Sequence, residues 1–315
     1  MNSSTALGWD IGGANVKAAL AVGSSVHVLA RPHPMWERPG KLKGLLSGMA
    51  DELGPADVIG ITMTAELADC FRTKAEGVGF VLDALESTFP DRLLRVFTAD
   101  AGFCSVPEAR RTPLAVASAN WAASANLLAR EGYEALLIDV GTTTTDIIPI
   151  VQGRVAACGR TDPERLTNGE LVYTGAVRTP VCAIAPWVPL RGRRCRVAAE
   201  FFAQAADIYL WLGNLSEADY IGRTPDGRGS SRAESGARLA RSICSDSTLL
   251  TEAEITAIAK HLAKLQVRAI SAGIAQVRAR LGATAPKTVL GAGLGAFLAC
   301  AAARRTGLAH HALAD

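Results

Sequence analysis

The sequence predicts an α/β protein built from two related halves, with a ligand cleft between them. Two stretches carry this prediction, because each places an Asp-x-Gly turn between two β-rich apolar runs: Thr5–Leu20 and Leu136–Ile150. At 315 residues, the chain is also long for a single hydrophobic core. Equivalent hairpins imply a duplicated domain, and ligands commonly bind where two domains meet. The expected halves are residues 1–130 and 131–315.

The first hairpin aligns with the second without a gap, and both are expected to run strand, turn, strand. The aligned pairs are Asp10 with Asp139, Gly12 with Gly141, Gly13 with Thr142, and Lys17 with Asp146. A single copy would be explained equally well by a plain polar hairpin tip. Because the pattern occurs twice, a phosphate site is favoured.

Strands and helices alternate through the rest of the first half. The expected strands are Val26–Ala30, Asp57–Thr62 and Leu94–Thr98, and the expected helices are Lys41–Leu53, Gly77–Phe89 and Ser118–Arg130. Thr64 and Glu66 directly follow a strand, where open α/β sheets present ligand groups. The alternative is that they cap the next helix or lie on its approach. Asn120 and Trp121 are interpreted as a cap and a core residue, with a place in the cleft as the alternative.

The second hairpin has the more polar turn. Leu136–Ile138 and Ile147–Ile150 are expected to be buried strands. The polar residues between them are Asp139, Gly141, Thr142, Thr143, Thr144, Thr145 and Asp146. The glycine lets the backbone approach an anion, N–H groups and hydroxyls can donate to phosphate oxygens, and aspartates can hold Mg²⁺.

After a strand expected at Arg154–Cys158, residues 159–180 form the least periodic and most polar stretch. Long irregular segments inside a compact domain are usually functional or disordered, and the interspersed apolar residues favour function. The candidates are Asp162 and Glu170 as base or metal ligand, Tyr173 as hydroxyl donor, and Arg160 and Arg178 as anion clamps. A surface loop with several arginines is the alternative.

The remainder of the chain predicts further helices and loops. Arg191–Arg196 packs four arginines into six positions, which indicates a solvated basic loop or a grip on a polyanion. Ala199–Leu212 is expected to be an amphipathic helix, and residues 223–234 a mobile loop. A capping box at Thr251–Glu254 is expected to open a helix that ends near Leu281.

A third glycine cluster lies in Thr288–Cys300, with Gly291, Gly293 and Gly295 between an expected strand and helix. The spacing fits the dinucleotide fingerprint G-x-G-x-x-A, but too little chain follows for the βαβ unit and its acidic partner. A glycine turn that ends a strand and approaches the phosphates or base of a ligand fits better.

Composition indicates an ordinary soluble protein, with 49% hydrophobic and 20% charged residues. The net charge of +3 gives no general signal for nucleic acid or membranes, so small-molecule substrates are the expected partners. No apolar span of transmembrane length occurs and the polar start lacks a signal-peptide layout, so the cytoplasm is the expected compartment. Seven cysteines without a C-x-x-C pair disfavour a disulfide framework or a zinc site.

The two hairpins and the late glycine turn resemble the phosphate-1, phosphate-2 and adenosine motifs of the actin-like (ribonuclease H-like) superfamily. Within it, D-I-G-G-A-N-x-K, D-V-G-T-T-T-T-D-I-I-P and G-E-L-V-Y-T-G-x-x-R-T-P-V are similar to hydantoinase/oxoprolinase relatives. More narrowly, the chain resembles proteins linked to the tetrahydromethanopterin and methanofuran one-carbon pathway. The narrow resemblance covers nearly the whole chain, and Asp162–Val181 is its most specific part.

The narrow resemblance implies an alkyl transfer in methanofuran biosynthesis. An aminomethylfuran-methyl group would pass from its diphosphate to the phenol oxygen of a glutamyltyramine or tyrosine acceptor, forming an ether and releasing diphosphate. Because a furfuryl carbon can carry developing positive charge, the enzyme must stabilise the departing diphosphate and accept the phenolic proton, whose ordinary pKa is about 10.

The resemblance also implies roles for individual residues. Mg²⁺ would lie near Asp10 and Asp139, and Lys17 would assist the departing diphosphate. Glu66, Asp146 and Glu170 are the candidate bases, and this set stays unranked. The residues expected to bind substrate or diphosphate are Gly12, Gly13, Asn15, Gly141, Thr142, Thr143, Thr144, Arg160, Tyr173, Arg178, Gly291, Gly293 and Gly295.

Two other classes of function compete with this one. The superfamily resemblance alone favours an ATP-dependent kinase or hydrolase, which ATP turnover would distinguish. The other class is a non-catalytic nucleotide-sensing scaffold, and the dense polar stretch from Asp162 to Thr179 argues against it.

Overall fold

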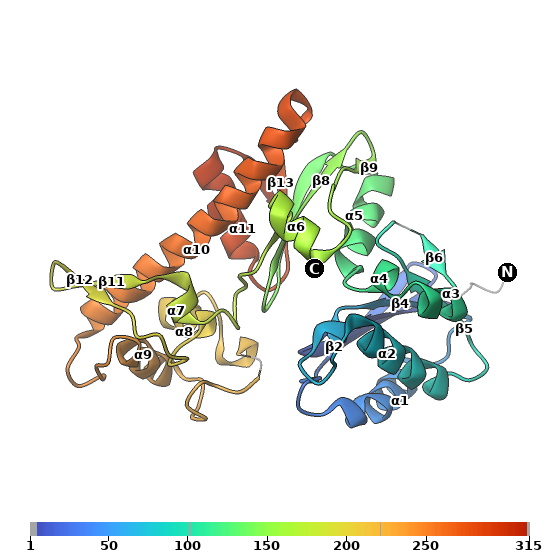
Figure 1. The fold of residues 1–315 in the computed structure, drawn as a ribbon, viewed down its shortest axis with the longest axis horizontal. Helices are drawn as coiled ribbons and strands as arrows, with labels where there is room; N and C mark the ends of the chain where they lie inside the picture. The colour runs from blue at the N-terminus through green and yellow to red at the C-terminus, as the bar shows by residue number, and fades with distance from the viewer. Residues whose placement is uncertain (1–4, 101, 221, 314–315) are drawn as a thin grey trace. The chain divides into compact units, whose positions relative to one another are not determined.

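The structure of the protein, a computed structural model, describes residues 5–100, 102–220 and 222–313 (Figure 1). The chain divides into two compact units, Met1–Leu128 with Arg160–Asp162, and Ala129–Gly159 with Pro163–Asp315. The boundary expected after residue 130 lies two residues from this division, which also assigns the short segment Arg160–Asp162 to the first unit.

The first unit is a mixed sheet with helices packed against it. Its strands are β1 (Thr5–Ile11), β2 (Asn15–Val22), β3 (Ser25–Pro32), β4 (Val58–Met63), β5 (Leu93–Phe97) and β6 (Phe103–Cys104), in the order β3-β2-β1-β4-β5-β6. Its helical segments are η1 (Pro39–Lys41), α1 (Leu42–Leu53), η2 (Ala65–Leu67), α2 (Lys74–Thr88), α3 (Val106–Arg111) and α4 (Pro113–Val116). Alternating residues of β1 are buried, and they join the apolar faces of α1 and α2 in one core.

The second unit repeats this plan on a larger scale. Its main sheet contains β7 (Ala135–Val140), β8 (Thr145–Val151), β9 (Arg154–Val155), β10 (Leu171–Val172), β13 (Thr288–Ala292) and β14 (Ala309–Ala312), in the order β10-β8-β7-β13-β14 with β9 paired to β8. A separate hairpin is formed by β11 (Trp187–Leu190) and β12 (Arg193–Arg196). The helical segments are α7 (Val181–Ile184), α8 (Ala205–Leu212), η3 (Glu217–Asp219), α9 (Arg232–Arg241), α10 (Glu252–Leu281), η4 (Gly282–Thr284) and α11 (Ala296–Thr306). Two helices cross the division between the units: α5 (Asn120–Arg130), and α6 (Asp162–Asn168), of which only the first residue belongs to the first unit.

The two sheets share one arrangement. In each, an antiparallel hairpin (β1–β2 or β7–β8) continues into two parallel strands, β4 and β5 in the first sheet and β13 and β14 in the second. The register confirms the gap-free alignment of the hairpins, since Asp10 lies opposite Lys17 and Asp139 lies opposite Asp146. The α/β class with duplicated actin-like halves is therefore confirmed.

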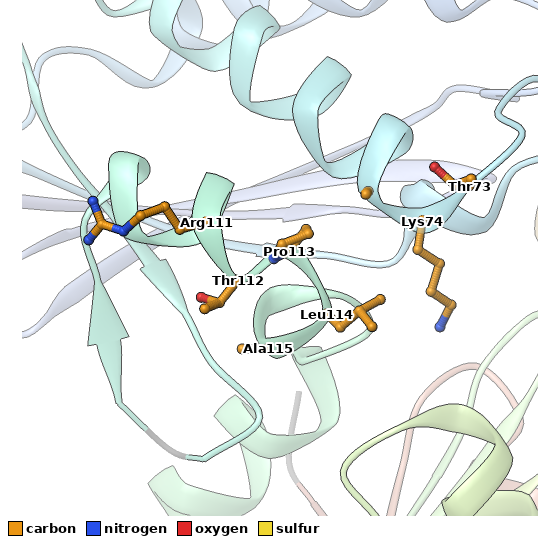
Figure 2. A pocket seen from close by; sticks show the side chains of 8 residues that line it. Thr73, Lys74, Arg111, Thr112, Pro113, Leu114 and Ala115 are labelled. Carbon is orange, nitrogen blue, oxygen red and sulfur yellow. The ribbon is translucent and has the colours of Figure 1, made fainter.

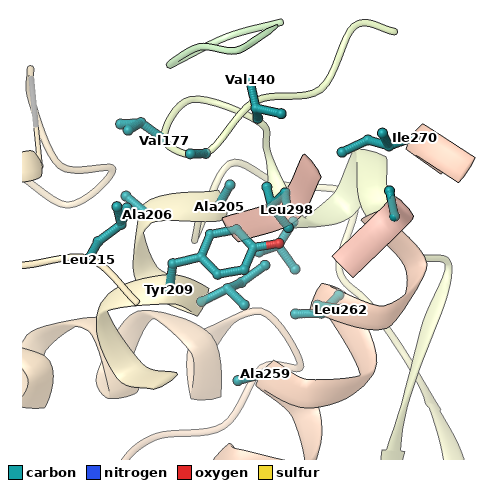
Figure 3. Packing of buried hydrophobic residues seen from close by; sticks show 14 of the residues in the cluster. Val140, Val177, Ala205, Ala206, Tyr209, Leu215, Ala259, Leu262, Ile270 and Leu298 are labelled. Carbon is teal, nitrogen blue, oxygen red and sulfur yellow. The ribbon is translucent and has the colours of Figure 1, made fainter. Parts of the chain in front are cut away.

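The core of the second unit is built around α8 and α10. Figure 3 shows Tyr209 of α8 among Ala259 and Leu262 of α10 and Leu298 of α11. The Tyr209 ring also lies edge-on to Phe297, with 4.9 Å between the ring centroids. Because α10 is 30 residues long, it spans this core and reaches the edge of the main sheet beside β8 and β10.

Several expected element bounds were wrong. Helix α2 begins at Lys74 and is capped by Thr73, whose hydroxyl accepts from the Glu76 N–H, so Thr64 and Glu66 are not its caps. Helix α8 begins only at Ala205, because a capping box of Gln204 and Asp207 starts it there. The strand expected at Arg154–Cys158 is only the two-residue β9, residues 159–180 contain α6 and β10, and the loop expected at 223–234 ends in α9.

Candidate functional site

The first hairpin holds Asp10 beside Lys17. The Gly12 N–H donates to the Asn15 carbonyl at 2.9 Å, and a Cβ on Gly12 would lie 2.7 Å from that oxygen, so the tight turn requires glycine. Lys17 Nζ lies 3.5 Å from Asp10 Oδ2, while Asp10 Oδ1 is buried without a hydrogen-bond partner among the described residues. Burial raises the pKa of the Asp10 carboxyl, and Lys17 and Thr62 offset this only in part.

The second hairpin replaces the lysine with a second carboxylate. The Gly141 N–H donates to the Thr144 carbonyl at 2.9 Å, as Gly12 does in the first hairpin. Asp146 lies opposite Asp139 and is bound by the buried Arg165, with 2.8 Å between Oδ1 and Nη2. Arg165 also donates to the Glu170 carbonyl, so this guanidinium joins β8 to the chain that follows α6.

Residues 174–179 form a strap that holds the turn of the second hairpin. The N–H groups of residues 176–178 donate to the carbonyls of Gly141 and Thr142, at 2.8 to 3.0 Å. A Cβ on Gly175 would lie 2.5 Å from the Thr143 nitrogen, so the strap can lie this close only with glycine there. Because the strap uses these carbonyls, it fixes the Thr142–Thr144 backbone.

The late glycine turn packs on the same hairpin. A Cβ on Gly293 would clash with the Asp139 carboxylate and the Val140 carbonyl, and one on Gly295 would clash with the Val140 side chain. The Gly295 N–H donates to the Val140 carbonyl at 2.8 Å, while Gly291 lies against His310 and Ala299. The glycines are thus explained by close contact within the second unit, and their expected contact with a ligand stays a prediction.

Glu170 lies in the interior of the second unit. Its side chain is fully buried, and its Oε1 accepts from the Cys158 N–H and from Arg280 Nη2, each at 2.6 Å. Oε2 accepts from the Gly159 N–H at 2.8 Å. Structural donors bind both oxygens and the side chain is buried, which argues against the predicted role of Glu170 as the base.

The remaining predicted residues of this stretch are divided between the two units. Arg160 belongs to the first unit, where its Nε pairs with Asp100 at 3.0 Å. In the second unit, Tyr173 is 60% exposed, whereas Arg178 is half-buried beside the Thr142 carbonyl that its N–H contacts. Asn15 and Gly13 are half-buried in the first turn, and the Gly13 carbonyl accepts from the Met35 N–H.

Glu66 lies in a cluster of four polar side chains at the carboxyl end of β4. The Ser118 hydroxyl lies 2.7 Å from Glu66 Oε1 and 3.0 Å from Asp162 Oδ2, and Lys74 Nζ lies 2.5 Å from the same Asp162 oxygen. Glu66 is 1% exposed, and its Oε2 has no partner among the described residues. Burial raises the pKa of the Glu66 carboxyl; Ser118 and Lys74 lower it by less.

Sequence reasoning did not single out Ser118 and Lys74 as site residues. No motif marks them, since Ser118 follows an apolar stretch and Lys74 opens a helix. Only the fold brings them to Glu66. The one available signal was Asp162, which had been considered as a base or metal ligand.

The first unit also contains an open, mostly apolar pocket of about 500 Å³, shown in Figure 2. It is lined by Thr73, Lys74, Ala75 and residues 111–115. None of the residues predicted to bind substrate lines it. Lys74 is the one member that it shares with the Glu66 cluster.

The carboxylates of the hairpins fit a magnesium ion that arrives with a phosphate ligand. Within the described residues, no three His, Cys, Asp or Glu side chains gather as a metal cage. Mg²⁺ usually takes one or two protein carboxylates and completes its shell with phosphate oxygens and water. Asp10 Oδ1 is a carboxylate oxygen without a hydrogen-bond partner among the described residues, as such a ligand requires, and Asp139 holds the equivalent position in the second hairpin.

Comparison with known proteins identifies the family. Residues 57–313 match the hydantoinase/oxoprolinase family. The chain belongs to this family. It is 38% identical over 257 residues to the (4-{4-[2-(gamma-L-glutamylamino)ethyl]phenoxymethyl}furan-2-yl)methanamine synthase of Methanocaldococcus jannaschii, covering 81% of this chain and 76% of that protein. The Methanococcus vannielii protein of the same name is 37% identical over 160 residues, 51% of this chain and 70% of that protein.

Solved structures show distant likenesses. The ethanolamine utilization protein EutJ from Carboxydothermus hydrogenoformans has a TM-score of 0.47 at 13% identity, covering 99% of this chain and 85% of that one. A ROK family protein from Streptococcus pneumoniae TIGR4 has a TM-score of 0.43 at 12% identity, covering 98% and 92%. The fold assignment rests on the strand order and register described above. Each described helix is too short or too polar to cross a membrane.

Proposed function

We propose that this hydantoinase/oxoprolinase-family protein is a synthase of methanofuran biosynthesis. It would transfer an aminomethylfuran-methyl group from its diphosphate to the phenol oxygen of a glutamyltyramine or tyrosine acceptor, forming an ether and releasing diphosphate. The observation that carries the proposal is the 38% identity, over 76% of its length, to a synthase whose named product contains this phenoxymethyl-furan ether.

The departing diphosphate requires donors and positive charge. Lys17 would supply charge from the first hairpin, and the N–H groups and hydroxyls of Thr142–Thr144 would supply donors from the second. In each unit the aspartate of the hairpin, Asp10 or Asp139, would offer a carboxylate to Mg²⁺, which would supply Lewis-acid stabilisation of the leaving group when bound. The strap supports the role of this turn as a donor, because the strap N–H groups bind the Gly141 and Thr142 carbonyls and so hold the turn in place.

The phenol requires a base, and Glu66 is the best of the three candidates. Asp146 is held by Arg165, and Glu170 is fully engaged in the interior. Glu66 keeps one unpartnered oxygen, and burial raises the pKa of its carboxyl toward that of the phenol. Arg160, Arg178 and Tyr173 remain proposed contacts for the acceptor's carboxylates or the diphosphate.

Product analysis by mass spectrometry tests the proposal. The protein is incubated with Mg²⁺, the furan-methyl diphosphate, a phenolic acceptor (γ-glutamyltyramine, tyramine or tyrosine in separate reactions) and ATP. We expect the ether and free diphosphate with ATP unchanged, and no ether when Mg²⁺ is chelated. Consumption of ATP without ether would refute the synthase and support the kinase or hydrolase.

A pair of matched variants tests whether Asp139 takes part in the reaction. Asp139→Asn should abolish most ether formation, because an amide binds Mg²⁺ more weakly than a carboxylate. Asp51→Asn, a change on the exposed face of α1, should behave as the unmodified protein does. Equal activity in both variants would remove Asp139 from the proposed magnesium site.

A further inference from the structure

The Ser118 hydroxyl lies between two carboxyl groups. It is 2.7 Å from Glu66 Oε1 and 3.0 Å from Asp162 Oδ2, both within hydrogen-bond range. A serine hydroxyl has one proton to donate, so it can donate to only one of the two. If both contacts are hydrogen bonds, one carboxyl must itself carry a proton and donate to Ser118.

The surroundings indicate which carboxyl carries that proton. Asp162 is ion-paired with Lys74 at 2.5 Å and keeps some exposure to solvent. Glu66 is buried at 1% exposure, and the charge of Asp162 further opposes its ionisation. The proton therefore belongs on Glu66 Oε1, and the unpartnered Oε2 is the carbonyl oxygen of a neutral acid.

The backbone holds this arrangement in place. Ser118 has φ 51°, a left-handed conformation that is uncommon outside glycine and that clusters at functional sites. Its neighbour Ala117 bridges to Met63 at the end of β4. On the other side, a Cβ on Gly77 would lie 2.5 Å from the Glu66 carbonyl, so α2 packs directly on the Glu66 backbone.

We propose that Glu66, Ser118 and Asp162 form a proton relay in which Glu66 rests as a neutral acid. Glu66 Oε2 accepts the phenolic proton as the phenol oxygen bonds to the furfuryl carbon and the carbon–diphosphate bond breaks. At the same time, the proton on Oε1 passes to Ser118 Oγ, and the Ser118 proton passes to Asp162 Oδ2. Asp162 then releases it to solvent. Glu66 is again a neutral acid, now with its proton on Oε2, and rotation of its carboxyl group and of the Ser118 hydroxyl restores the resting arrangement.

The substrate of this relay depends on the proposed function, whereas the protonation of Glu66 in the free protein does not. Glu66 is the catalytic residue, while Ser118, Asp162 and Lys74 are positioning residues that act through it. The charged groups that act on Glu66 are Lys74 of α2 and Asp162. The protonation of Glu66 can therefore be measured without any substrate.

The first measurement is the carbon-13 resonance of the Glu66 side-chain carboxyl in the full-length protein labelled at glutamate Cδ. The Glu66→Gln variant assigns the resonance. We expect it at the position of a neutral acid at pH 7, moving to the carboxylate position only at higher pH. In Asp162→Asn this transition should move to lower pH, because the charge that opposes ionisation is lost while Lys74 remains.

The second measurement is turnover in Ser118→Gly. Glycine suits the left-handed backbone and removes only the hydroxyl, so we expect a folded protein with neutral Glu66, an unchanged KM for the phenol, and kcat lowered at least about 100-fold. Ser87→Ala removes a hydroxyl that, among the described residues, bonds the Ala84 carbonyl of α2 alone, and should leave kcat unchanged.

The outcomes separate the relay from the proposed function. An ionised Glu66 at pH 7, or full kcat in Ser118→Gly, would overturn the relay even if the ether forms. A neutral Glu66 in a protein that forms no ether would instead overturn the proposed function, and with it the substrate assigned to the relay.

Discussion

Lys17 reaches across the first hairpin to Asp10, its partner in the strand register, with 3.5 Å between Nζ and Oδ2. The lysine is 60% exposed, whereas one oxygen of the aspartate is buried without a partner among the described residues. An exposed ion pair of this kind contributes little to stability. Under the proposed function, both groups would instead serve a phosphate ligand.

Lys17→Ala should weaken catalysis and leave stability nearly unchanged. Losing a charge-assisted hydrogen bond of about 1.5–3 kcal/mol to the leaving group corresponds to a roughly 10- to 150-fold lower kcat/KM. Ether formation measured at low diphosphate-substrate concentration checks this. Lys41→Ala, at an exposed lysine, serves as the control, and a wild-type rate in Lys17→Ala would contradict the assigned role.

Glu66→Gln should change how stability depends on pH. The folded protein raises the pKa of Glu66, so Glu66 favours the folded state at low pH, and this contribution is lost as pH rises through the folded pKa. Glutamine mimics the neutral acid at every pH. The difference in unfolding free energy, variant minus wild type, should therefore increase from pH 5 to pH 8. Urea unfolding at both pH values measures it, and a constant difference would argue against a raised pKa.

Glu170→Ala should destabilise the second unit by about 3–5 kcal/mol, because it leaves Arg280 and the N–H groups of Cys158 and Gly159 without their acceptor. Glu52→Gln breaks an exposed pair with Arg31 and should cost less than about 1 kcal/mol. Denaturant unfolding compares the two. Glu170→Gln keeps the shape of the side chain, so a folded Glu170→Gln protein without activity would restore Glu170 as a candidate base.

Gly293→Ala should damage the second hairpin. A methyl group there meets the Asp139 carboxylate and the Val140 carbonyl, and φ of 78° is itself costly for alanine by about 1–2 kcal/mol. Gly48→Ala, in α1 with open space around it, should instead stabilise the protein by about 0.5–1 kcal/mol. Thermal unfolding of both variants checks the contrast; equal shifts would show that the late turn does not depend on close packing.

The sequence predicted the elements that recur in it and those that a short local motif marks. The hairpins were predicted because Asp10 and Asp139 recur in the same spacing, and the 30-residue α10 because its capping box is read from four residues. Bounds failed where a cap was overlooked, as at Thr73 and Gln204. The gathering of the Glu66 cluster was not predicted for another reason. Ser118 and Asp162 are distant in sequence from Glu66, and only tertiary folding brings them together.

Residue type alone does not show what a side chain contacts. Glu170 looked like a base because it is acidic and lies in a polar stretch, but its burial and its partners make it part of the interior. The late glycines are predicted to approach a ligand, and the structure shows in addition that Gly293 and Gly295 are needed for contact with the second hairpin. Distinguishing these roles requires the neighbours of each side chain, which a single sequence does not contain.

Helix α10 fixes the distance between two points of attachment within the second unit. Gln266 donates to Thr174 and Gly175 in the strap, and about four turns further on Arg280 donates to Glu170. The two attachments are held in phase by one unbroken helix. Inserting a single residue between them would turn Arg280 by about 100° relative to Gln266, so the helix could satisfy one attachment only by abandoning the other. The length of α10 is therefore as constrained as its composition.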